Sequence, residues 1–267
     1  MAITISFGIQ KGGVGKTTTA AITSYLLSKE AKVLAVDFDS QGNLTSFLTQ
    51  RNIYDFTEKT ILQALKDKNP IPYIYEVSPN LHVLPAEDYL STLPQYLYRE
   101  YGPTGKNVNE LLKDTLAVVK DEYDYIFIDM PPNLGDHTVN GVTASDYAVV
   151  LLQSEPFCYD ALERYLEFLQ GVKEYTNQDL KLAGILTCML DARATIDLSI
   201  LEKTRNDYED LVFDSVIRRR SKIKEYTIEG IKTHTKKDNE ALQQYTDFVK
   251  ELKKRVQKRP IQRTTQR

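Results

Sequence analysis

One glycine-rich loop, Lys11-Gly12-Gly13-Val14-Gly15-Lys16-Thr17-Thr18, determines how the rest of this 267-residue sequence is interpreted. It follows an apolar-rich run at residues 3–9 and precedes a predicted helix at residues 16–27. The phosphate-loop pattern G-x-x-x-x-G-K-[ST] is met only in its second half, because Gln10 stands where the first glycine belongs. Placed between a strand and a helix, the loop still predicts a phosphate-binding site.

The chemistry of the loop follows from its residue types. Glycines allow positive φ angles and let main-chain N–H groups approach phosphate oxygens, while the helix that follows directs its positive end at them. Lys16 is expected to reach the β- and γ-phosphates, and the Thr17 hydroxyl to bind magnesium. The predicted nucleotide-binding residues of the loop are Lys11, Gly12, Gly13, Val14, Gly15, Lys16, Thr17 and Thr18.

Short apolar runs that alternate with helical patterns predict a parallel sheet covered on both faces. The predicted strands are 3–9, 33–36, 81–84, 125–128, 147–152, 182–189 and 211–217. The predicted helices are 16–27, 107–120 with Asn107 as N-cap, 157–172, 196–208 and 240–256. Residues 51–104 are less regular and predict loops and short helices at the sheet edge. We expect one α/β P-loop NTPase domain with a mostly parallel, twisted sheet flanked by helices at residues 1–257, and a flexible basic tail at 258–267.

Composition narrows the class of protein. Apolar residues make up 42% and charged residues 27%, as in a folded globular chain. Cys158 and Cys188 lie far apart and match no metal-ligand spacing, which suits a reducing compartment. No signal peptide is readable, and no apolar run approaches the ~18 residues of a membrane span. The sequence therefore predicts a cytoplasmic protein.

The loop resembles the deviant Walker A motif of the ParA/MinD ATPases, and Lys11 matches that family's signature lysine. Residues 36–43 and 126–135 resemble the family's second acidic motif and its Walker B region, and 187–191 and 216–219 resemble later segments more weakly. The resemblance covers nearly the whole chain. It implies an ATPase that binds ATP and Mg²⁺ and forms an ATP-dependent homodimer, in which Lys11 reaches the partner subunit's nucleotide.

Aspartates at the ends of predicted strands complete the expected site. Asp129 can hold a magnesium-bound water beside the γ-phosphate. The resemblance implies that Asp39 orients the attacking water, with Asp37 a nearby magnesium candidate; aspartates that merely end strands are the alternative interpretation. The predicted catalytic residues are thus Lys11, Lys16 and Asp39, and the magnesium residues Thr17, Asp37 and Asp129. Met189 is a candidate adenine contact, as is Thr227.

Positive charge collects at the carboxyl end. Residues 215–267 hold 16 Lys and Arg against 6 Asp and Glu, within a chain of net charge −3. ParA-type proteins bind DNA without sequence preference, and five cations in seven residues, 218–224, could neutralise phosphates. A solvated charged face is the alternative. Arg218 replaces the family's usual proline. The candidate DNA-binding residues are Arg218, Arg219, Arg220, Lys222 and Lys224.

Two functions of the family remain to be compared. MinD-type relatives are membrane-associated spatial regulators that use a C-terminal amphipathic helix. In this chain, apolar residues recur at 3–4 spacing in 240–256 and predict a stripe that faces the core. Beyond this helix, Ile261 is the one bulky aliphatic residue, too little to insert into a membrane. We therefore expect a DNA-partition ATPase for plasmid or chromosome segregation, associated with the nucleoid and without membrane binding. A ParB-like centromere-binding partner would stimulate its weak hydrolysis and release it. The chain begins at its first strand, so no helix-turn-helix extension is expected, and no motif indicates a small-molecule ligase or kinase.

Overall fold

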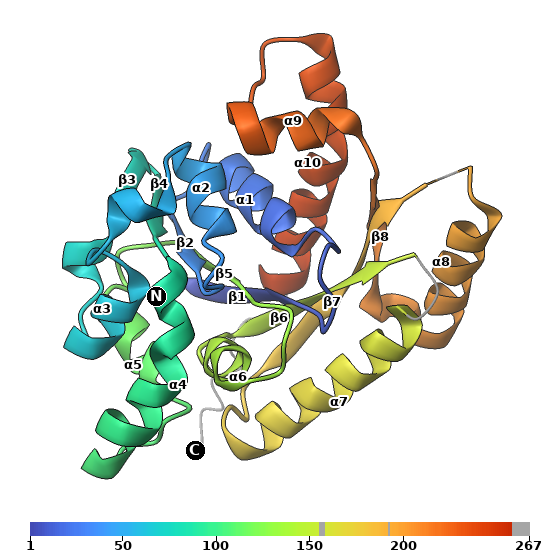
Figure 1. Ribbon diagram of the computed structural model, residues 1–267. Helices are drawn as coiled ribbons and strands as arrows, with labels where there is room; N and C mark the ends of the chain where they lie inside the picture. Colours follow the sequence, from blue (N-terminus) through green and yellow to red (C-terminus); the bar gives the residue numbers. More distant parts are fainter. Residues whose placement is uncertain (155–157, 192, 258–267) are drawn as a thin grey trace, which may run out of the picture.

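An eight-stranded sheet organises the chain, in the strand order β3-β4-β2-β5-β1-β6-β7-β8 (Figure 1). The computed structural model describes residues 1–154, 158–191 and 193–257. Each neighbouring pair of strands is parallel except β3 and β4, which are antiparallel. The strands are β1 (Ile3–Gly8), β2 (Val33–Asp37), β3 (Tyr75–Ser78), β4 (Leu81–Leu84), β5 (Tyr125–Asp129), β6 (Tyr147–Gln153), β7 (Lys181–Leu190) and β8 (Val212–Arg218).

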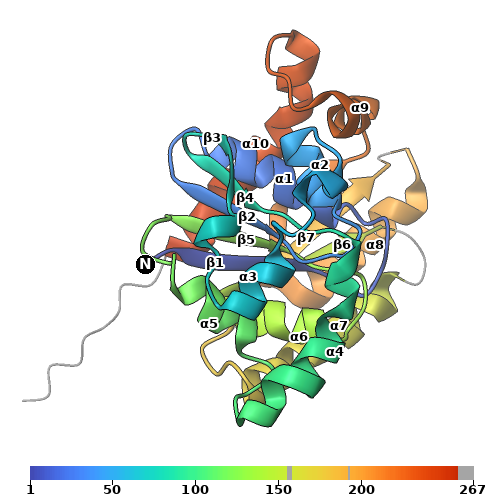
Figure 2. The same ribbon diagram turned by 60° about the vertical axis from the view of Figure 1, so that its left-hand side comes forward.

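Helices cover both faces of the sheet, because its central strands are apolar on both sides. Every residue of β2 and β5 is buried, which requires a helical layer above and below. Helices α1, α2 and α10 lie over one face and α5, α6 and α7 over the other (Figures 1 and 2). The helices are α1 (Lys16–Leu27), α2 (Asn43–Thr49), α3 (Ile61–Asp67), α4 (Leu93–Tyr96), α5 (Leu111–Ala117), α6 (Asp136–Thr143), α7 (Cys158–Tyr175), α8 (Thr195–Tyr208), α9 (Ser221–Glu229) and α10 (Lys236–Gln257).

The predicted fold class is confirmed, with corrections at particular elements. The prediction that Asn107 caps a helix is wrong: α5 begins at Leu111, and the Asn107 side chain accepts from the amide of Asn109 in a turn instead. Strand β4 corresponds to the strand predicted at 81–84. Strand β3 is an addition, because only loops and short helices were expected in the rest of residues 51–104. Helix α9 was not predicted. The first residue of the predicted helix 157–172 lies outside the described residues, as does the predicted tail at 258–267.

Helix α10 begins four residues before the predicted start, because Thr235 and Asp238 cap each other. The Thr235 hydroxyl accepts from the amide of Asp238, whose carboxylate accepts from the Thr235 amide and hydroxyl. The apolar stripe predicted in this helix is buried as expected, at Leu242, Tyr245, Val249, Leu252 and Val256. This stripe packs against the sheet and α1.

Arg255, near the end of α10, fastens this helix to the sheet. Its guanidinium donates to the carbonyl oxygens of Ala183, Asp210 and Val212 at 3.1, 3.0 and 2.8 Å. It also lies 4.2 Å from the ring centroid of Phe213 and pairs with Glu251. One side chain thus connects two segments of chain, at Ala183 and at residues 210–213, to α10.

The two edge strands are short or irregular. Strand β3 has four residues and shifts register against β4, and β8 shifts register twice against β7. No helix in the described ranges, 1–154, 158–191 and 193–257, combines the length and the apolar character needed to cross a membrane.

Candidate functional site

A cavity of about 1090 Å³ opens at the carboxyl ends of the central strands, beside the start of α1. Parallel α/β sheets place their ligand sites at this edge, because the loops that leave neighbouring strands meet there. The predicted loop lines the cavity together with the segments after β2, β5, β7 and β8. The predicted site residues among its lining are Gly12, Gly13, Val14, Gly15, Lys16, Thr17, Thr18, Asp39, Met189, Arg218, Arg219, Arg220 and Lys224, with Thr227.

The loop exposes main-chain N–H groups to the cavity. Gly15, the residue before α1, has φ 90°, a left-handed conformation that L side chains adopt only with strain. As the N-cap residue of α1, Gly15 has no side chain that could cap the helix, and the first turn of α1 holds no acidic residue. The free N–H groups and the positive end of the helix dipole therefore favour an anion at this point.

Lys16 is buried and folded onto its own loop. Its Nζ donates to the main-chain carbonyl of Lys11 at 2.8 Å. Burial lowers the pKa of Lys16, and the charges of Asp129 and Asp39 oppose that shift. Among the described residues its hydrogen-bond acceptor is this neutral carbonyl, and a buried ammonium in such a position is well prepared to bind an anion such as phosphate.

Lys11 takes a different direction from Lys16. Its Nζ donates to the Sγ of Cys158, the first residue of α7, at 2.8 Å. Of the described residues that line the cavity, those of the loop begin at Gly12, so Lys11 does not line it. Within one subunit, then, the Lys11 side chain lies against α7, and its contact with a nucleotide stays a prediction.

Asp37 and Asp129 are fully buried at the ends of β2 and β5. The Asp37 carboxylate accepts from the Thr45 amide at 2.8 Å and from the Thr45 hydroxyl at 2.7 Å. Within the described part of the chain, neither Asp129 oxygen has a hydrogen-bond partner. Burial raises the pKa of Asp37 to about 7, and burial followed by the charge of Asp37 raises the pKa of Asp129 well above its usual range.

These two carboxyl groups fit a cation. A buried carboxylate without a donor is costly unless a proton or a metal ion neutralises it. Thr17 lines the cavity, and its hydroxyl lies near enough to Asp129 to oppose the rise in the pKa of that carboxyl. A hydroxyl with carboxylate oxygens and water is a ligand set that Mg²⁺ accepts. Asp129 is thus the better placed of the two for a cation, because Thr45 already satisfies Asp37.

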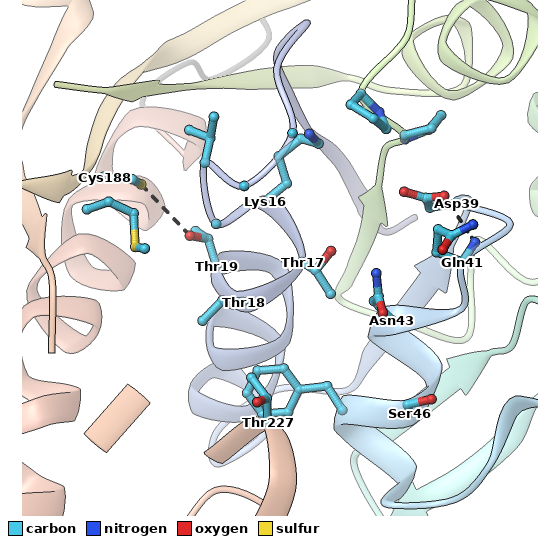
Figure 3. Close-up of a pocket in the computed structure, with 18 of the residues that line it drawn as sticks. Lys16, Thr17, Thr18, Thr19, Asp39, Gln41, Asn43, Ser46, Cys188 and Thr227 are labelled. Atoms are coloured by element: carbon cyan, nitrogen blue, oxygen red, sulfur yellow. Dashed lines mark hydrogen bonds between the residues drawn. The ribbon is translucent and has the colours of Figure 1, made fainter. Parts of the chain in front are cut away.

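Asp39 lies in the loop between β2 and α2, across the cavity from Thr17 (Figure 3). Its Oδ1 accepts from the amide of Gln41 at 3.1 Å. The loop turns at Gly42, which has φ 62°; a Cβ there would lie 2.5 Å from Ile53 and 2.9 Å from the Ala86 carbonyl oxygen. Glycine is therefore required, and it fixes the approach of Asp39 to the cavity.

The far end of the cavity is formed by elements that the sequence did not reveal. Ser46 and Phe47 of α2 and Ile223 and Thr227 of α9 line it. Met189 of β7, whose φ is 60°, also lines the cavity. Figure 3 shows Ser46 and Thr227 on opposite sides of this end. The signal that could have indicated α9 is the apolar spacing of Ile223 and Tyr226, which was obscured by the surrounding charges.

The predicted basic residues divide into two groups. Arg218, Arg219, Arg220 and Lys224 are exposed at the rim of the cavity. Lys222 instead pairs with Glu225 at 2.7 Å and with the buried Asp238 at 3.4 Å. Although burial opposes it, hydrogen bonds from Thr235 and Tyr226 and the Lys222 ammonium lower the pKa of Asp238 to about 2. Lys222 thus fastens α9 to α10.

Comparison with known proteins gives consistent matches. Residues 2–182 match a family model described as an AAA domain. The chain is 36% identical over 225 residues to the sporulation initiation inhibitor protein Soj of Bacillus subtilis, covering 83% of this chain and 86% of that protein. It is 36% identical over 219 residues to the chromosome partitioning protein ParA of Myxococcus xanthus, covering 81% and 75%.

Among solved structures, the cobyrinic acid a,c-diamide synthase of Mycobacterium smegmatis with bound ADP and magnesium superimposes with a TM-score of 0.80. It is 28% identical in sequence, and the match covers 97% of this chain and 96% of that one. The shared architecture extends over the phosphate loop and the strand ends described above.

Proposed function

This chain belongs to the ParA family of partition ATPases, and we propose that it pairs on ATP, binds DNA without sequence preference and hydrolyses ATP slowly until a partner protein stimulates it. The observation that carries the proposal is that the phosphate loop and the Asp39 loop line one cavity, with Asp129 buried behind it, just before the lining residues Pro131 and Pro132, and without a hydrogen-bond partner among the described residues. Nucleotide chemistry needs these three parts together.

ATP and Mg²⁺ are the proposed ligands, as ADP and magnesium are in the Mycobacterium smegmatis structure. The loop amides and Lys16 would hold the phosphates, and Thr17 and Asp129 would hold the metal ion, directly or through water. The metal ion neutralises charge on the phosphate oxygens, which is the chemistry it supplies in phosphoryl transfer. Lys16 would exchange the Lys11 carbonyl for phosphate oxygens.

Asp39 is the proposed group that orients the attacking water. Its carboxylate reaches the cavity and, within the part of the chain that the structure describes, accepts from the amide of Gln41 through Oδ1, so Oδ2 would be available for a water. Lys11 would come from the partner subunit, in keeping with its direction away from its own cavity. A single subunit would lack this charge, so hydrolysis is expected to be slow.

DNA binding is proposed for the four exposed cations, Arg218, Arg219, Arg220 and Lys224. They lie at the rim of the nucleotide cavity, so the presence of a nucleotide can influence their arrangement. Lys222 would contribute through the placement of α9 and not through direct contact. Membrane binding through α10 is disfavoured, because its apolar stripe is buried in the core.

Binding to random-sequence duplex DNA over a salt series tests the proposal. Four phosphate contacts predict a log–log slope of about −4 with ATP, and steeper if both subunits of a pair engage. Binding should be much weaker with ADP. Anionic vesicles, sedimented in parallel, serve as the comparison. Retention on vesicles without retention on DNA would contradict the proposal and favour a membrane-associated regulator of the MinD type.

A further inference from the structure

Phe38 stands between Asp37 and Asp39 and anchors the loop that carries Asp39. Its side chain is fully buried, and its amide donates to the main-chain carbonyl of Asp129 at 3.1 Å. The Asp39 amide lies 3.4 Å from Oδ1 of Asp37, and the Asp39 carboxylate accepts from the amide of Gln41 in the same turn. The direction in which Asp39 enters the cavity therefore depends on how the Phe38 ring is held.

Helix α6 holds the Phe38 ring with two residues of one face, His137 and Gly141. The ring centroids of His137 and Phe38 are 5.6 Å apart and the rings meet edge to face at 60°. A Cβ built on Gly141 would lie 3.5 Å from Cδ1 of Phe38 and would clash with the side chain of Met130, so glycine lets the helix come close. Because residues four apart share a side of a helix, this face of α6 closes over the Phe38 ring.

The His137 ring is itself fixed by a second contact. Its Nε2 lies 2.9 Å from the main-chain carbonyl of Leu90, a residue whose side chain is fully buried. A carbonyl oxygen can only accept, so Nε2 carries the hydrogen and donates it. His137 is half-buried and lines the cavity. One imidazole thus connects the segment before α4 with α6 and with the Asp39 loop.

We infer that His137 is a positioning residue for hydrolysis: by holding the Phe38 ring, it fixes Asp39 in the direction that orients the attacking water. The inference rests on the proposed function, because it takes Asp39 to orient that water. The imidazole acts through Phe38, so its removal affects turnover and leaves the phosphate loop in place.

Replacing His137 with leucine tests the inference, because leucine fills much of the same space but has neither the donor nor the ring. His137→Leu should lower the rate of ATP hydrolysis about tenfold, since a misplaced water costs rate and not binding. Its affinity for a fluorescent ATP analogue should stay within about twofold. Phosphate release gives the rate, measured where thermal unfolding shows the variant to be folded. An affinity reduced as much as the rate would place the ring on the nucleotide itself and overturn the inference.

Two further variants each keep one of the contacts of His137. His137→Phe keeps an aromatic ring beside Phe38 but has no donor for the Leu90 carbonyl, and His137→Gln keeps a donor but has no ring. Because the proposed action passes through the Phe38 ring, His137→Phe should retain more of the hydrolysis rate than His137→Gln. The reverse order would overturn the inference.

Tyr98→Phe is the matched control for a loosened α6. The Tyr98 hydroxyl donates at 2.7 Å to Oδ1 of Asp136, the residue before His137. Its loss removes a hydrogen bond from the same end of α6 and leaves Phe38 and His137 unchanged, so the hydrolysis rate should stay within about twofold. A loss of rate in Tyr98→Phe equal to that in His137→Leu would show that any loosening of α6 has this effect, and would overturn the inference.

A double-mutant cycle with Phe38→Leu tests the route of the effect. If His137 acts through the Phe38 ring, His137→Leu should lower the rate by less than about twofold once that ring is gone. Losses that multiply would mean that the two residues act independently, and would overturn the inference. Asp39→Ala separates the two levels of the argument. Undiminished hydrolysis by Asp39→Ala would contradict the proposed function and this inference with it, whereas impaired Asp39→Ala beside normal His137→Leu would contradict the inference alone.

Discussion

Asp37 and Asp129 lie directly opposite each other in the register between β2 and β5, and both are fully buried. Two carboxyl groups in such a position cannot both be charged without compensation. Thr45 satisfies Asp37, whereas Asp129 has no donor within the described part of the chain. The pair is thus prepared for one positive charge, supplied by a proton or by a metal ion.

Stability of the nucleotide-free protein should fall as pH rises through the range in which Asp37 titrates. Folded Asp37 keeps its proton up to about pH 7, because burial raises its pKa. The unfolded chain releases that proton near pH ~4, so the contribution to stability is present at low pH and is lost between about pH 4 and 7. Asp37→Asn cannot titrate but can still accept from Thr45. Over this pH interval its unfolding free energy should therefore fall by roughly 4 kcal/mol less than that of the unmodified chain. Parallel curves from urea unfolding of the two chains would contradict this assignment.

Asp39→Ala should separate nucleotide binding from turnover. Without the carboxylate, the attacking water is not oriented, and the hydrolysis rate should fall on the order of 100-fold or more. The phosphate loop is untouched, so affinity for ATP should stay within about twofold. Phosphate release and equilibrium binding of a fluorescent ATP analogue measure the two quantities. Undiminished hydrolysis would mean that another group orients the water.

The two lysines of the loop should differ in what they affect. Lys16→Ala removes the ammonium inside the cavity and should weaken ATP binding on the order of 100-fold. Lys11→Ala should leave binding by the single subunit nearly unchanged but prevent ATP-dependent pairing. Titration calorimetry with ATP and sedimentation with ATP distinguish the variants. Similar losses of ATP affinity in both would place Lys11 in its own subunit's site.

Arg219 and Lys222 form a matched pair for the DNA surface. Arg219→Ala should weaken DNA binding and make the salt slope shallower by about 1. Lys222→Ala should leave that slope unchanged and instead lower the melting temperature, because buried Asp238 loses its ammonium partner. Filter binding over a salt series and thermal unfolding are the measurements. A reduced slope for Lys222→Ala at normal stability would return Lys222 to the set of direct DNA contacts.

Arg255→Ala should destabilise the fold by about 3 kcal/mol, because several carbonyl oxygens lose a donor at once. Arg255→Lys keeps the charge beside Glu251 but lacks the planar fork, so it should recover only part of the loss. Urea unfolding measures both variants. Full recovery with lysine would show that charge alone explains the contribution of this residue.

The sequence predicted the parts of this protein whose signals are local. Strands β2 and β5 are short apolar runs that end in aspartate, and the phosphate loop carries its own pattern of glycines and lysines. The order of alternating elements then fixed where these loops meet. Local chemistry was sufficient there, because parallel sheets gather strand ends at one edge.

Other features depend on contacts between distant residues and could not be predicted. In the sequence, Lys222 cannot be distinguished from its exposed basic neighbours. Its ion pair with the buried Asp238, sixteen residues later, is seen only in the structure. The direction of Lys11 toward Cys158 depends on how α7 packs. The early start of α10 depends on a cap between Thr235 and Asp238, which apolar spacing does not indicate.

The edge strands of the sheet affect how this protein associates with other copies of itself at high local concentration. Strand β3 offers four residues in broken register, and β8 pairs unevenly even with its own neighbour. Such edges are poor templates for a strand from another molecule. Concentrated copies are therefore expected to remain discrete and reversible in their association, without merging into fibrils through continuous β-structure.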